Sequence, residues 1–177
     1  MAMTNERKLL LLGLLRRSDM HGYLLSAHLD GSVPISLKKP TAYNLLDRME
    51  QDGWVQHRDE PTGDRPCRVF SVTERGERAF QDLLRQQLKA FPPAEFPAAV
   101  SLSFLDAIPA TEALKLLRHR RQAVERYRES LVPQEEDEAV HHQHHSGSAH
   151  LAVEYARRFV ELEIRLLDEV IEHLESQ

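Results

Sequence analysis

The sequence predicts a mainly α-helical protein with one two-stranded β wing, organised in two parts, residues 1–91 and 92–177. Three observations support this prediction. Apolar residues recur at steps of three and four in most segments, which is the spacing of one helical face. Residues 54–72 alternate instead, around a centre dense in turn formers. Six of the seven glycines lie in residues 1–76, so the second part is almost uninterrupted helix-forming sequence.

Length and composition predict a globular protein without a membrane-spanning segment. The 177 residues suffice for one or two small domains, and 41% hydrophobic residues supply a packed core. No apolar run approaches the roughly 20 residues that span a bilayer, and the leucine-rich segment Leu9–Leu15 lacks a following cleavage site. We therefore expect a cytoplasmic protein without a membrane partner. The single cysteine, Cys67, excludes an internal disulfide.

Charge is distributed unevenly between the two parts. The net charge is −5, but residues 1–76 carry 11 Lys and Arg against 10 Asp and Glu, whereas residues 77–177 carry 12 against 18. Nucleic-acid binding depends on the local field of the docking face rather than on the whole-chain sum. The acidic total therefore weakens the case for a nucleic-acid partner without excluding it.

Two helices are predicted at the start of the chain. Thr4 is a plausible N-cap for a leucine-rich helix that ends near Arg17. A short second helix follows within residues 20–30, and Gly31 and Pro34 end it. His21 at its start suits a packing and capping role, and the alternative is a contact to a DNA phosphate.

The third predicted helix has clear boundaries. Pro40 suits a first helical turn, and Gly53 suits the left-handed residue just past a helix end. Four apolar residues between them fall at i, i+3, i+4 and i+7, so they form one core face. These are Ala42, Leu45, Leu46 and Met49.

The opposite face of this helix is polar and follows two lysines. Its side chains are Thr41, Tyr43, Asn44, Asp47 and Arg48, and the lysines are Lys38 and Lys39. Such a helix suits a DNA major groove, with the lysines on phosphates and Thr41, Asn44 and Arg48 near base edges. The alternative is an ordinary amphipathic helix with a solvated face.

A hairpin and a fourth helix complete the first part. The predicted wing offers three candidate phosphate contacts, Arg58, Arg65 and Arg68, whose attraction is reduced by the acids Asp59, Glu60 and Asp64. Thr73 then caps a helix from Glu74 to about Phe91. The order helix, helix, helix, hairpin is that of a winged helix-turn-helix domain, in which the later helix reads DNA.

Four sequence blocks resemble the PadR family of bacterial transcription regulators. They are Leu12–Leu15, His21–Tyr23, Thr41–Glu50 with Gly53–Val55, and Arg68–Gly76. The resemblance covers residues 7–90, about half the chain. It implies a dimeric DNA-binding regulator, commonly a repressor, in which the helix of residues 41–48 enters the major groove. The longer, virulence-activator-like members have a helical tail for dimerisation that is similar in pattern to residues 92–177.

The second part is predicted to be helical and to dimerise. A short helix is expected at 98–107 and a longer one at 111–131. The last helix, 150–174, has an apolar stripe of Leu151, Tyr155, Phe159, Leu162, Leu166, Val170 and Leu174. Ala156, Val160, Leu167 and Ile171 widen that stripe beyond what one facing helix would cover, so a second copy is the simplest partner. A dimer would bind a pseudo-palindromic operator.

Two clusters invite other readings. His141 and His145 are weak candidate metal ligands within the histidine-rich stretch 141–150, but neither ligand order nor count matches a closed zinc site, and a solvated loop is the alternative. Cys67, with His57 on the facing strand, suggests a redox sensor. The alternative is that Cys67 is a small hydrophobic residue of the wing. We expect no cofactor.

No phosphate-binding glycine loop or nucleophile turn points to an enzyme. The leading hypothesis is a homodimeric repressor of double-stranded DNA, with an unidentified small-molecule effector as a further possible partner. The alternatives are a winged-helix protein-interaction module without useful DNA affinity, and a metal-responsive regulator using residues 141–150.

Overall fold

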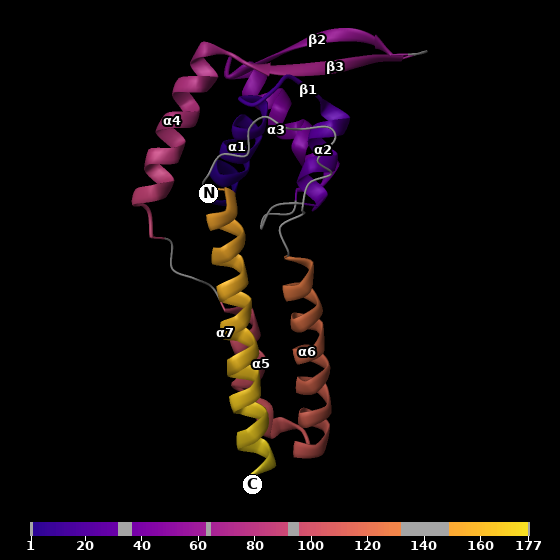
Figure 1. Cartoon of the computed structure of the whole chain (residues 1–177), viewed down its shortest axis with the longest axis vertical. Helices are drawn as coiled ribbons and strands as arrows, with labels where there is room; N and C mark the ends of the chain where they lie inside the picture. The colour runs from indigo at the N-terminus through magenta and orange to yellow at the C-terminus, as the bar shows by residue number, and fades with distance from the viewer. Residues whose placement is uncertain (1, 32–36, 63–64, 92–95, 132–148, 177) are drawn as a thin grey trace. The chain divides into compact units, whose positions relative to one another are not determined.

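The computed structural model describes residues 2–31, 37–62, 65–91, 96–131 and 149–176 (Figure 1). The chain forms two compact units, Met1–Pro92 and Pro93–Gln177. The first unit contains α1 (Ala2–Leu15), β1 (Met20–His21), α2 (Gly22–Gly31), α3 (Lys39–Gln51), β2 (Val55–Thr62), β3 (Arg65–Val72) and α4 (Glu74–Lys89). The second contains α5 (Pro97–Leu102), the short 3-10 helix η1 (Leu105–Ala107), α6 (Ala110–Ser130) and α7 (Ala149–Glu175). The mainly helical winged fold predicted from the sequence is confirmed.

The sheet of the first unit has three antiparallel strands in the order β1-β3-β2. The predicted hairpin is present, and its register runs from Val55 opposite Val72 to Thr62 opposite Arg65. The third strand was not expected, because the two residues of β1 precede α2 and pair with the free edge of β3. His21 lies in this strand opposite Val69, directly before α2, and its Nε2 lies 3.8 Å from a carboxylate oxygen of Glu60.

Side chains from four helices, α1 to α4, and the sheet form the core of the first unit. Phe70 at the centre of β3 is fully buried. It packs with Leu11, Leu12 and Leu15 of α1, Leu25 and Leu29 of α2, and the four α3 residues predicted to face inward. Burying a leucine or phenylalanine side chain contributes roughly 1.5–3 kcal/mol. This shared core fixes α3 against the sheet.

Two helix boundaries differ from those predicted. Helix α1 already includes Ala2, so Thr4 lies within the helix instead of capping it, and the helix ends at Leu15 rather than near Arg17. Helix α4 ends at Lys89, before Phe91. Its start is as predicted, because the Thr73 hydroxyl accepts a hydrogen bond from the amide of Gly76 at 3.0 Å.

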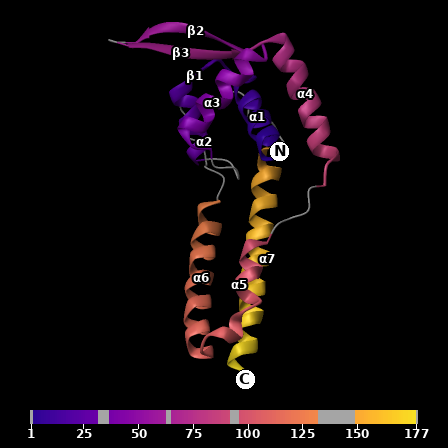
Figure 2. The same cartoon turned by 180° about the vertical axis from the view of Figure 1, so that it is seen from behind.

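In the second unit, α6 and α7 pack side by side (Figure 2). Leu117 of α6 packs with Leu167 and Ile171 of α7, and all three are buried. Three arginines of α6 pair with acids of α7: Arg118 with Glu175, Arg120 with Glu163, and Arg121 with Asp168. The segment predicted as one helix at 98–107 is helical, but it divides into α5 and η1.

Candidate nucleic-acid interface

Helix α3 presents the polar face predicted from the sequence. Its inward residues Ala42, Leu45, Leu46 and Met49 are buried, while Asn44 and Arg48 on the other side are exposed. Lys38, the N-cap residue, and Lys39 are exposed at the start of the helix, and Thr41 is half-buried. Three of these side chains, Lys38, Lys39 and Arg48, form no ion pair within the part of the chain that the structure describes. They remain available to an anionic partner.

The N-terminus of α3 adds to this positive field. Aligned peptide dipoles place a partial positive charge at the start of a helix, where free amides can meet a phosphate oxygen. Pro40 in the first turn lacks an amide, but its missing donor falls where no intrahelical bond is formed. Lys39 also lies 5.7 Å from the centre of the Tyr23 ring, which is itself 63% exposed.

Tyr43 is located differently from its polar neighbours. Its ring is half-buried and packs against the core, and a Cβ atom added at Gly22 would lie 2.6 Å from the Tyr43 hydroxyl. The absence of a side chain at Gly22 therefore lets α2 approach α3 closely. This contact gives Tyr43 a packing role between the two helices.

The wing arginines that the structure describes are each held by carboxylates. Arg58 on β2 donates to Asp19 at 2.5 Å and to Glu60 at 3.0 Å. Both hydrogen bonds raise the pKa of the Arg58 guanidinium above its already high ordinary value, and the bond to Asp19 has the larger effect. Arg58 therefore stays charged, but two acids offset its charge.

Arg68 on β3 is held in the same way by α3. Its guanidinium donates to Asp47 at 2.9 Å, and it lies 5.8 Å and 5.4 Å from the ring centres of Tyr43 and Phe70. The side chain of Arg65 lies outside the described residues. Glu60 was expected to reduce the attraction of the wing for phosphate, and in the structure it pairs with Arg58. Asp19 and Asp47 also pair with wing arginines. These two contacts were not predicted, because no sequence signal indicates that Asp19 and Asp47 lie beside the wing.

The turn between α3 and the wing is fixed at both ends. Glu50 near the end of α3 accepts a hydrogen bond from a ring nitrogen of His57 at 2.6 Å and from the His57 amide at 3.2 Å. Gly53 has φ +71°, as predicted for a residue just past a helix end. These contacts hold β2 against α3, so the polar face of the helix keeps a fixed orientation relative to the wing.

The other predicted sites have different outcomes. On α7, Leu151, Tyr155, Phe159, Leu162 and Leu166 are 44–76% exposed, whereas Val170 and Leu174 are half-buried against the α6–α7 core. His141 and His145 lie outside the described residues, and the described part of the chain contains no group of three or more candidate metal ligands. Cys67 is opposite Glu60, while His57 is opposite Phe70, so cysteine and histidine are not cross-strand partners.

No helix in the described ranges is long and apolar enough to span a membrane.

Comparison with known proteins finds relatives by sequence profile and by structure. Residues 11–82 match the model of the family described as "Transcriptional regulator PadR-like family". Bacillus subtilis PadR in complex with operator DNA is 16% identical with a TM-score of 0.76, over 94% of this chain and 98% of that chain.

Two further structures are similar. BC1756, a PadR-like transcriptional regulator from Bacillus cereus, is 15% identical with a TM-score of 0.70, over 96% of this chain and 98% of that one. Bacillus subtilis PadR in complex with p-coumaric acid is 17% identical with a TM-score of 0.70, over 95% and 94%. At these identities the structural similarity establishes the fold. No curated protein matches.

Proposed function

We propose that this chain is a PadR-like transcriptional regulator and that it represses transcription by binding a pseudo-palindromic operator as a homodimer. One observation carries the proposal. Helix α3 is buried on one face and presents Asn44, Arg48 and half-buried Thr41 on the other, behind exposed Lys38 and Lys39. An α-helix of this kind fits the major groove of B-form DNA.

The roles of these side chains follow from their chemistry. Arginine can donate two parallel hydrogen bonds to guanine, and asparagine can pair with the edge of adenine, so Arg48 and Asn44 are the candidate base readers. Lysine is a mobile point charge suited to phosphate, so Lys38 and Lys39 would set the register of the helix on the backbone. Arg58 and Arg65 of the wing would contact the flanking phosphates.

The dimer is proposed from the exposed face of α7. Its apolar side chains Tyr155, Phe159 and Leu162 are 76%, 49% and 44% exposed, although the opposite face of α7 already packs on α6. An apolar stripe of this length on a helix is typical of a surface that packs on another subunit. A two-fold dimer would place two α3 helices about 34 Å apart, one turn of DNA, or a multiple of that distance.

We propose operator binding for this chain by analogy with a structure that has a similar fold. Bacillus subtilis PadR has been captured with operator DNA and, separately, with p-coumaric acid. A small-molecule effector is therefore a reasonable further partner of this chain. We place the protein in the cytoplasm on the ground of its proposed DNA partner.

A specific observation favours one alternative, a winged-helix module that binds protein instead of DNA. Arg58 and Arg68 are offset by Asp19, Glu60 and Asp47, and the whole chain carries a net charge of −5. A wing neutralised in this way attracts phosphates less strongly.

A gel shift with DNA from upstream of the protein's own coding region, at two salt concentrations, separates the two functions. Each phosphate contact contributes about 0.9 to the fall of log K per unit of log salt concentration. The proposed function predicts a retarded complex that weakens steeply with salt. Absence of any complex at low salt, or a complex insensitive to salt, would favour the protein-interaction module.

A further inference from the structure

Arg58 on β2 is held by two acids from different segments of the first unit. Its Nη1 atom donates to Asp19, just before β1, at 2.5 Å, and its Nε atom donates to Glu60 on β2 at 3.0 Å. Different nitrogens of one guanidinium group therefore serve separate carboxylates, which the several donors of arginine permit. In the absence of DNA the positive charge of Arg58 is offset twice.

Strand pairing places these side chains on one face of the sheet. His21 on β1 and Arg58 on β2 both lie opposite Val69 on β3, and side chains directly opposite each other in antiparallel strands share a face. Glu60 lies two residues after Arg58 in the same strand, so it shares that face as well. Its carboxylate also lies 3.8 Å from the His21 ring nitrogen Nε2. The surroundings of Arg58 are thus determined by the register of the sheet.

This cluster lies next to the helix that is proposed to read DNA. Asp19 contacts Arg58 on the wing. Four residues later, the ring of Tyr23 has its centre 5.7 Å from the ammonium of Lys39 at the start of α3. The segment from Asp19 to Tyr23 therefore connects Arg58 to the start of α3. If α3 docks on DNA, Arg58 is on the side of the first unit that meets the phosphate backbone.

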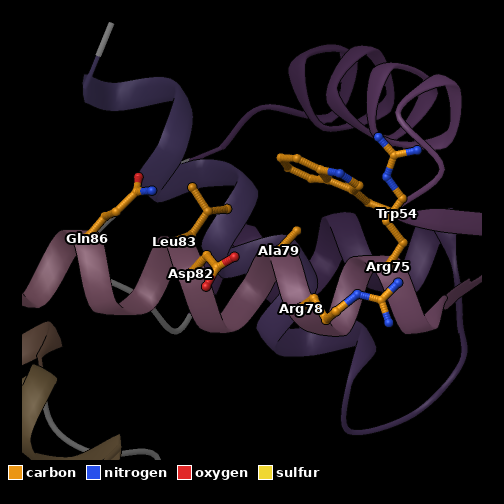
Figure 3. A pocket seen from close by; sticks show the side chains of 7 residues that line it. All are labelled: Trp54, Arg75, Arg78, Ala79, Asp82, Leu83 and Gln86. Carbon is orange, nitrogen blue, oxygen red and sulfur yellow. The ribbon is translucent and has the colours of Figure 1, made fainter.

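Pairing of this kind is not general among the arginines of the first unit. Arg75 and Arg78 of α4 line a pocket beside Trp54 (Figure 3), and neither forms an ion pair with any residue that the structure describes. Asp82 lines the same pocket, but it pairs with Arg85 at 3.1 Å. This second pair lies on α4, outside the wing, and it provides a comparison for the pair on the wing.

We propose that Asp19 and Glu60 compete with DNA phosphates for Arg58, and that they thereby lower the affinity of the chain for DNA of any sequence. This inference rests on the proposed function, because it requires that α3 docks on DNA. A phosphate gains Arg58 only when both carboxylates release it, so the net contribution of this arginine is small. Exposed ion pairs are weak, so the competition reduces binding without preventing it.

Affinity measurements with the full-length chain test this role directly. The released variant, Asp19→Asn with Glu60→Gln, removes both negative charges and keeps the shapes of the side chains. At about 100 mM salt it should bind random duplex DNA and operator DNA alike, roughly threefold to tenfold more tightly for each wing that gains a phosphate contact. The slope of log K against log salt concentration should become steeper by about one unit for each such wing.

Replacing the arginine shows whether the gain belongs to Arg58. Arg58→Gln in the unaltered chain should change affinity by less than about twofold, because the acids already offset this charge. In the released variant the same substitution should remove the gain. A double-mutant cycle of this form separates release of Arg58 from the general effect of removing negative charge.

A matched control is available on α4. Asp82→Asn and Asp19→Asn each remove one carboxylate from an exposed arginine of the first unit, so they change the net charge equally. Asp19→Asn should bind random DNA more tightly, whereas Asp82→Asn should bind as the unaltered chain does. Circular dichroism confirms that each variant is folded, and the single variants Asp19→Asn and Glu60→Gln replace the double one if it does not fold.

Three results would overturn the proposal: no gain in the released variant, a gain that persists after Arg58→Gln, or an equal gain from Asp82→Asn. A gain confined to operator DNA would also contradict it, because phosphate contacts are independent of sequence. The proposed function is judged separately, on whether the unaltered chain binds DNA at low salt. If only the released variant binds, and binding requires Arg58, operator binding fails but the competition for Arg58 stands.

Discussion

The guanidinium of Arg68 donates a hydrogen bond to the carboxylate of Asp47 at 2.9 Å, which joins strand β3 of the wing to helix α3. Asp47 is an unusual residue for a helix proposed to enter a DNA groove, because a carboxylate repels phosphate. Its pairing with Arg68 gives it a structural partner. The two side chains are 46% and 37% exposed, so the pair resembles a surface ion pair in strength.

We expect this pair to couple the wing to α3 without reading a base. A double-mutant cycle with Asp47→Asn and Arg68→Gln, measured by urea unfolding of the first unit, should give a coupling of about 0.2–1 kcal/mol. The ratio of operator to random affinity should be the same for Asp47→Asn as for the unaltered protein. Strict additivity in the cycle, or a loss confined to one base pair of the operator, would contradict this interpretation.

The exposed face of α7 should hold the dimer. Phe159→Gln with Leu162→Gln removes apolar area from that face but leaves the buried α6–α7 contacts of Leu167 and Ile171. Light scattering at micromolar concentration should show a dimer for the unaltered chain and a shift to monomer for the variant. The control Arg165→Gln with Glu169→Gln alters two exposed residues of the same helix at constant net charge, and it should stay dimeric. An unaltered chain that is already monomeric would exclude the proposed dimer.

Thr73 should be important for stability because its hydroxyl serves two contacts. It accepts from the Gly76 amide at 3.0 Å and donates to the Gly53 carbonyl at 2.7 Å. Thr73→Ala should lower the free energy of unfolding by about 1–2 kcal/mol, as measured by Trp54 fluorescence in urea. Thr73→Ser keeps the hydroxyl and should lose much less. Equal losses in the two variants would mean that the methyl group, not the hydroxyl, matters.

One ion pair of the first unit predicts a pH dependence. Arg16 donates to Glu77 at 2.5 Å, and this hydrogen bond lowers the pKa of the Glu77 carboxyl below its ordinary value. A carboxyl whose pKa is lower in the folded state stabilises the fold above its unfolded pKa, and the effect is lost as pH falls through its folded pKa. The stability difference between the unaltered chain and Glu77→Gln should therefore be present at neutral pH and disappear in acid. A difference that stays constant with pH would rule out the pair as its source.

Local signals were sufficient to predict α3 and its orientation. Pro40 and Gly53 bound the helix, and spacing alone separated the buried Leu45, Leu46 and Met49 from the exposed Asn44. These predictions hold because helix periodicity and terminal residues are determined within a few positions of the chain. The cap at Thr73 was predictable for the same reason.

Contacts between distant segments could not be predicted in this way. Arg58 contacts Asp19 across 39 residues of sequence, and the short strand β1 pairs with β3, which lies far along the chain. The apolar stripe of α7 was predicted as one surface, but the structure divides it. Val170 and Leu174 pack toward α6, whereas Leu151 and Tyr155 remain exposed, and periodicity does not indicate which part of a wide stripe a neighbouring helix will cover.

The central claim is that the exposed face of α3 reads DNA sequence, and affinity measurements on operator and random DNA test it most directly. Asn44→Ala and Arg48→Ala should each cost about 1–3 kcal/mol on the operator and less on random DNA, because a base contact is specific to one sequence. Lys38→Ala and Lys39→Ala should weaken both complexes alike and reduce the salt slope by about one unit, as expected for phosphate contacts. If all four variants fold and bind the operator as tightly as the unaltered chain, α3 is not the element that reads DNA.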